Sequence, residues 1–140
     1  MKQFIVILAV LPLMLVFLAQ FTLDQINDGK ISAVNSIVYS AKERAKQDGY
    51  FTEENKQQMI EKIKEACGAE DEDIAVVSAD SNPRQRLSGA SAKWEDDLIF
   101  YEVRVTMSGI IAGGDMFGIK DADNKRCYVI QAYTASEYLP

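Results

Sequence analysis

Residues 4–23 read FIVILAVLPLMLVFLAQFTL. This stretch holds no charged side chain, and Gln20 and Thr22 are its only polar residues. A helix of about 20 apolar residues is long enough to cross the ~30 Å hydrocarbon core of a bilayer. The stretch therefore predicts a transmembrane anchor over residues 1–23, with the remainder of the chain outside the bilayer.

We expect this anchor to be retained rather than cleaved as a signal peptide. A signal peptidase requires small residues before its cut, and the best position, after Ala19, places the bulky Phe17 third from the cut. Lys2 lies on the amino-terminal side, which favours a single-pass protein with an extracytoplasmic carboxy-terminal domain. The residues expected to face lipid or neighbouring helices are Phe4, Leu8, Leu11, Pro12, Leu15, Phe17 and Phe21.

The bulk composition excludes several classes of function. The chain has 140 residues, a net charge of -6 and no histidine, and about 117 residues remain beyond the anchor, enough for one small domain. An acidic chain without a clustered basic face does not indicate nucleic-acid binding. The absence of histidine removes Ser-His and Cys-His nucleophiles and most zinc sites, so we expect no enzyme and no cofactor.

The anchor leads into an amphipathic continuation with no strong helix breaker before Gly49. Apolar residues recur there at intervals of three and four, which indicates one face of a helix. We expect one nearly continuous helix to about Asp48, with this face buried against a sheet. The face consists chiefly of Val34, Ile37, Val38, Ala41 and Ala45.

The remaining pattern predicts a second helix followed by strands. Thr52 is placed as an N-cap, and Gly68 as the end of that helix. Residues 73–79, 98–107 and 127–133 are typical of strands, and the middle segment alternates most regularly. Helices first and strands afterwards favour an α+β fold with an antiparallel sheet of three to four strands. Residues 24–140 would then form one domain, packed on the continuation of the anchor helix.

Two cysteines, Cys67 and Cys127, lie in this domain. An even number of cysteines in an exported domain permits one disulfide, which would close a loop of about sixty residues and contribute ~4 kcal/mol. The alternative is two unpaired thiols, each packed as a small side chain. We expect the disulfide, joining the end of the second helix to the last strand.

Three short motifs could carry chemistry, and each has a simpler interpretation. Residues 121–125 resemble the opening of a calcium loop, but Lys125 and Arg126 stand where an oxygen ligand and a glycine are required. Residues 113–118 are glycine-rich without the Gly-Lys-Ser/Thr of a phosphate loop, and we expect their apolar side chains to fold back onto the sheet. The aspartates at 96–97 are adjacent before a strand, so they point apart and do not indicate a catalytic pair.

The amino-terminal half resembles a known family. Residues 8–18 read LAVLPLMLVFL, residues 40–45 read SAKERA, and a Gly-x-x-Thr turn covers residues 49–52. This arrangement is similar to the TadE-type pseudopilins of tight-adherence pilus systems, which carry a leucine-rich run around Leu-Pro-Leu, an Ala-x-x-x-Ala helix and a variable carboxy-terminal domain. Two features depart from the family pattern. No small residue precedes the apolar run, and Val6 stands where a glutamate is usual.

The resemblance implies a pilin-like, membrane-anchored structural or accessory component of a pilus or secretion apparatus. Its partners would be the membrane and other pilin-like or assembly-platform proteins, contacted through the amino-terminal helix, and homo-oligomers are one form that this packing could take. The alternative is a membrane-tethered extracytoplasmic binding or sensing module. That alternative requires a concave pocket or a partner groove between the sheet and a helix.

Overall fold

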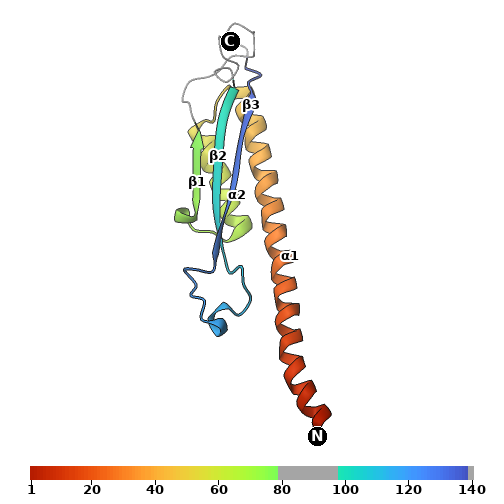
Figure 1. The fold of residues 1–140 in the computed structure, drawn as a ribbon. Coiled ribbons are helices and arrows are strands. Elements are labelled where there is room, and N and C mark those ends of the chain that lie inside the picture. Colours follow the sequence, from red (N-terminus) through yellow and green to blue (C-terminus); the bar gives the residue numbers. More distant parts are fainter. Residues whose placement is uncertain (79–97, 139–140) are drawn as a thin grey trace.

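The computed structural model describes residues 1–78 and 98–138, in the element order α1, α2, β1, β2, β3 (Figure 1). Two short 3₁₀ turns, η1 over Asp71–Asp73 and η3 over Gly114–Phe117, lie in the connections. The predicted α+β class is confirmed, and the described sheet has three strands. The aspartates at 96–97, weighed above as a catalytic pair, lie outside the described residues.

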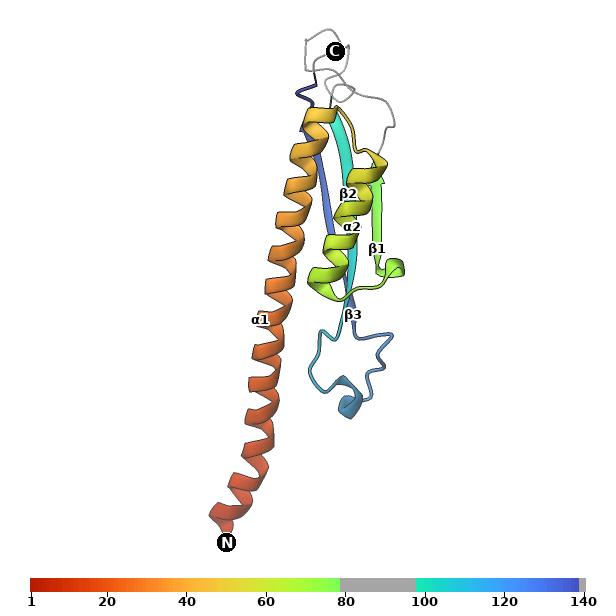
Figure 2. The same ribbon diagram turned by 180° about the vertical axis from the view of Figure 1, so that it is seen from behind.

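Helix α1 runs over Lys2–Asp48, a length of 47 residues or about 70 Å at 1.5 Å per residue. Pro12 and Gly29 both lie inside α1, and neither interrupts it. The helix ends at Gly49, whose φ of 83° is a left-handed conformation that glycine adopts without a steric penalty. The prediction of one continuous helix to Asp48 is therefore confirmed, and Figures 1 and 2 show its amino-terminal end projecting well beyond the sheet.

Helix α2 covers Glu53–Cys67 and begins at the predicted cap. The Thr52 hydroxyl accepts a hydrogen bond from the Asn55 backbone N–H at 3.1 Å, which satisfies one of the free donors of the first turn. Glu53 and Glu54 lie in that turn, where their charge suits the helix dipole. Gly68 ends the helix, as its position in the sequence predicted.

The sheet consists of β1 (Ile74–Ser78), β2 (Leu98–Ser108) and β3 (Lys125–Ala135), with antiparallel neighbours in the order β1-β2-β3. Alternation along β2 is strict, because every second residue is buried. That inner face contacts the helices, and Figure 2 shows α2 lying across it. The opposite face carries the aromatic pair Phe100 and Tyr133, whose ring centroids lie 5.1 Å apart.

The core lies between this inner face and the two helices. The upper half of α1 packs against α2 and runs along β3, so helices and sheet form two layers. The buried apolar residues are Val34, Val38, Ala41, Ala45, Phe51, Met59, Ile63, Ile74, Ile99, Tyr101, Val103, Val105 and Met107.

One residue of the predicted helix face is less buried than the others. Ile37 packs against the core, but it is only half-buried and lines a shallow groove between α1 and α2, beside Met59. Ile37 therefore contacts α2 at the edge of the core and is not fully buried. The reason is the second helix, which covers the flank of α1 on which Ile37 lies, while Val34 and Val38 point into the core.

The loop between β2 and β3 also differs from the prediction. Ile110 packs on the edge of the core, but Met116 is 86% exposed and Phe117 is 63% exposed. Their side chains do not fold back onto the sheet. Figures 1 and 2 show this loop extending past the end of the sheet toward the amino-terminal end of α1, with the η3 turn at its far end.

Candidate functional site

The amino-terminal half of α1 is an uncovered apolar surface. Within the described part of the chain, α1 alone is long and apolar enough to cross a membrane, and none of its most apolar window is buried. The predicted packing residues Phe4, Leu8, Leu11, Leu15, Phe17 and Phe21 are all exposed, and Pro12 lies among them without breaking the helix. An apolar helix surface of this length that the described residues leave exposed is typical of a helix surrounded by lipid or by other apolar helices.

The carboxy-terminal half of the same helix is packed into the core of the domain. Val34, Val38, Ala41 and Ala45 are buried, each at 5% exposure or less. The Asn55 side chain, itself buried, donates a hydrogen bond to the Ala41 carbonyl at 2.9 Å and so ties α2 to α1. One rigid helix therefore connects the bare apolar surface directly to the globular core.

Gln20 joins the two regions at the foot of the domain. Its side-chain amide donates to the Ile110 carbonyl at 3.0 Å, and its side-chain oxygen accepts from the Ala112 backbone N–H at 2.9 Å. The amide also donates to the Asp24 carboxylate at 2.8 Å, which holds the Gln20 side chain in place. The β2–β3 loop is thus attached to α1 within the last turn of the apolar stretch.

Asn124 organises the interior of that loop. Its side-chain oxygen accepts from the Ile111 N–H at 2.7 Å and its amide donates to the Ile111 carbonyl at 3.0 Å, as a second strand would. Gly114 lies so close that a Cβ there would meet the Asn124 amide nitrogen at 3.0 Å. This region was considered above as the opening of a calcium loop. Its asparagine bonds to the backbone instead.

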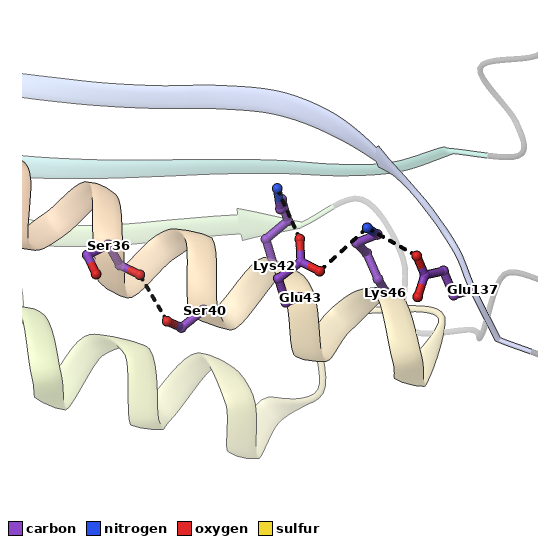
Figure 3. A network of polar contacts seen from close by, with 6 residues as sticks. All are labelled: Ser36, Ser40, Lys42, Glu43, Lys46 and Glu137. Atoms are coloured by element: carbon purple, nitrogen blue, oxygen red, sulfur yellow. Dashed lines mark hydrogen bonds and ion pairs between the residues drawn. The ribbon is translucent and has the colours of Figure 1, made fainter.

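A charged network fixes the other end of the domain, where the chain leaves β3 (Figure 3). The Glu137 N–H donates to the Lys46 carbonyl at 2.8 Å, and the Lys46 ammonium lies 3.2 Å from the Glu137 carboxylate. Lys46 also reaches Glu43, which pairs with Lys42 at 3.2 Å. The hydrogen bond from Lys42 lowers the pKa of Glu43, and the bond to Glu137 raises the pKa of Lys46.

The predicted disulfide is absent, and both cysteines are free thiols. Cys67 lies at the end of α2, partly buried against the core, and burial raises the pKa of its thiol. Cys127 is exposed on β3, opposite Thr106 and in register with the outer face of the sheet. The prediction is wrong because the sheet separates the two side chains. A count of cysteines does not reveal which face of a strand each one occupies.

A cavity of about 490 Å³ lies between α1 and the sheet, directly above the loop. Asp24 and Asp28 contribute carboxylates and Arg126 a guanidinium, so both charge signs line it. Asn27 is 92% buried at its wall and makes no side-chain hydrogen bond to the described residues. The complete lining is Asp24, Asn27, Asp28, Ile31, Met107, Ile110, Arg126, Cys127 and Tyr128.

Sequence reasoning missed Gln20, Asn27 and Asn124. A glutamine inside an otherwise apolar run is the signal that could have identified Gln20, because an unpaired amide at that position is unfavourable in a bilayer. Nothing local identifies the partners of the two asparagines. Within residues 1–78 and 98–138, no three histidine, cysteine, aspartate or glutamate side chains gather as a metal would require.

Comparisons of the chain with protein-family models, with curated proteins and with solved structures found no match.

Proposed function

We propose that this protein is a membrane-anchored, pilin-like structural component of a pilus or secretion apparatus. The observation that carries the proposal is the division of α1 into a bare apolar half and a half built into the domain core. A helix of this kind inserts in a bilayer and then packs laterally against similar helices, while the domain presents its surface outside. The resemblance of residues 1–55 to TadE-type pseudopilins supports the same function.

The anchor and its orientation are tested first. The intact mass of protein from its native membrane should include residues 1–23, and a mass lacking about the first 19 residues would identify a cleaved signal. In intact cells, a membrane-impermeant maleimide should label Cys127, which is exposed. Labelling of Cys127 only after the membrane is opened would reverse the orientation.

Lateral packing is tested by photo-crosslinking in the native membrane. A photoreactive amino acid replaces Leu11 or Leu15 in turn, and the matched control replaces Tyr39, which is exposed on the domain half of α1. We expect the two apolar positions to crosslink to other pilin-like or assembly-platform proteins, or to a second copy, and Tyr39 to give no such adduct. Adducts with lipid alone from both apolar positions would overturn the structural role.

A second candidate function is a membrane-tethered binding module, and the cavity between α1 and the sheet favours it. Its volume suits a small ligand, and Asn27 supplies a buried donor and acceptor at its wall. A ligand in this cavity should raise the Tm of the protein, and Asn27→Leu should abolish that rise, whereas Gln57→Leu on the exposed surface of α2 should leave it unchanged. An equal rise in Tm in the Asn27→Leu variant would reject binding there.

A further inference from the structure

The end of the β2–β3 loop presents apolar side chains that the rest of the chain leaves bare. Met116 is 86% exposed, Phe117 is 63% exposed, and Ile111 is 42% exposed. Met116 and Phe117 belong to the η3 turn, which Figures 1 and 2 place at the far end of the loop from the sheet. Adjacent exposed methionine and phenylalanine side chains indicate a surface that contacts an apolar phase.

The attachment of the loop determines which apolar phase this is. Gln20, which binds the loop backbone at Ile110 and Ala112, lies three residues before the end of the apolar stretch at Leu23. At 1.5 Å per residue, Gln20 is about 4–5 Å inside that stretch. From this attachment the loop continues toward the amino-terminal end of α1, so η3 lies alongside the apolar helix rather than above it.

We infer that the β2–β3 loop enters the outer interface of the bilayer that holds α1, with Met116 and Phe117 among the lipids. This inference rests on the membrane anchor of the proposed function. A bilayer surrounding residues 4–23 necessarily contacts anything fixed beside residue 20, so lipid reaches the loop without a second protein. The loop and α1 then hold the domain to the membrane at two points, which restricts tilting of the domain relative to the bilayer.

The hydrogen bonding of the loop suits this environment, since backbone groups without partners are costly away from water. The Met116 N–H donates a hydrogen bond to the Gly113 carbonyl at 2.9 Å, and the Ile119 N–H donates to the Gly114 carbonyl at 2.9 Å. The Gly118 N–H donates to the backbone carbonyl of Asp115 at 3.1 Å. The donors of Ile111 and Ala112 are satisfied by Asn124 and Gln20, as described above. The loop therefore enters lipid with these donors already bonded.

The charges of the loop limit its depth and exclude an electrostatic attachment. Residues 109–124 contain three aspartates and one lysine, so the loop is acidic and gains nothing from anionic headgroups. Asp115 adjoins Met116 and must stay at the level of headgroups and water. Insertion is therefore shallow and driven by the apolar side chains, as for other interfacial segments.

Depth-dependent quenching in lipid vesicles tests the inference with the full chain. In a background of Cys67→Ala and Cys127→Ser, one cysteine replaces Met116 and carries an environment-sensitive fluorophore. The protein is reconstituted in phosphatidylcholine vesicles that contain spin-labelled lipid. Met116→Cys should show blue-shifted emission that is strongly quenched by spin labels near the headgroup. Phe117→Cys provides a second loop position in case the first probe perturbs the loop.

Two controls separate the outcomes. Leu11→Cys reports the anchor and should be quenched, whereas Val77→Cys, half-exposed on the outer face of β1, should not be. A quenched Leu11 probe with unquenched loop probes would overturn the inference and leave the anchor intact. An unquenched Leu11 probe would overturn the anchor itself. Loop emission that shifts only as the protein-to-lipid ratio rises would identify a second copy as the occupant, and would also overturn the inference.

Discussion

The continuity of α1 with the domain core predicts that two identical substitutions in this helix have very different effects. Val34 is fully buried in the core, whereas Val10 is 46% exposed in the apolar half. Val34→Ala deletes two buried methyl groups, at ~0.8 kcal/mol each, and leaves a cavity that costs about 1 kcal/mol more. Alanine regains about 0.5 kcal/mol in helix propensity, so the free energy of unfolding should fall by about 2 kcal/mol.

Thermal unfolding of the full chain in lipid nanodiscs measures this difference. A loss of about 2 kcal/mol in a domain of this size should lower Tm by about 8 °C. Near-UV circular dichroism reports the transition, because Phe51 and Tyr101 are buried with ring centroids 5.4 Å apart. Val10→Ala is the matched control and should change stability by no more than about 0.5 kcal/mol.

The size of each shift separates the outcomes. Equally large shifts for Val34→Ala and Val10→Ala would mean that the amino-terminal half of α1 is also packed within the protein, contrary to its exposure. A shift for Val34→Ala as small as that of the control would refute the packing described here.

Three further predictions concern the polar contacts and the thiols. Asn55→Ala removes the hydrogen bond to the Ala41 carbonyl and should lower the free energy of unfolding, measured by urea titration, by about 1 kcal/mol. The control Gln57→Ala, on the exposed surface of α2, should leave the free energy of unfolding unchanged. Glu43 should titrate below its ordinary pKa of 4.5 in an NMR pH series, and Lys42→Met should move that midpoint upward. Because the pKa of Glu43 is lowered in the folded protein, the contribution of Glu43 to stability is present above about pH 4.5 and is lost as the pH falls through the pKa of the folded state. An unchanged titration midpoint for Glu43 in Lys42→Met would contradict the ion pair. Unreduced protein should contain two free thiols. Cys127 should be alkylated before Cys67, because Cys67 is partly buried and the pKa of its thiol is raised. An intact mass two hydrogens lower than that of the free-thiol protein would show that the two cysteines form a disulfide.

Features that depend on neighbouring residues in the chain could be predicted from the sequence. The ends of α1 and α2 follow from Gly49, Thr52 and Gly68, because caps act within one helical turn. The alternation of residues 98–107 predicted β2 to within one residue, because side chains alternate between the two faces of a strand. The apolar stretch over residues 4–23 likewise specified a helix of membrane-spanning length before any tertiary contact was known.

Features that depend on which elements meet required the tertiary structure. The two cysteines could not be separated in advance, since only the packing of α2 on one face of the sheet puts Cys67 and Cys127 on opposite sides. The bonds from Gln20 to the β2–β3 loop join residues about 90 positions apart, and no local periodicity carries that information. The expectation that Met116 and Phe117 fold back onto the sheet rested on their apolar character alone, which does not give the direction of the loop. They are bare because the loop extends past the end of the sheet toward the amino-terminal end of α1.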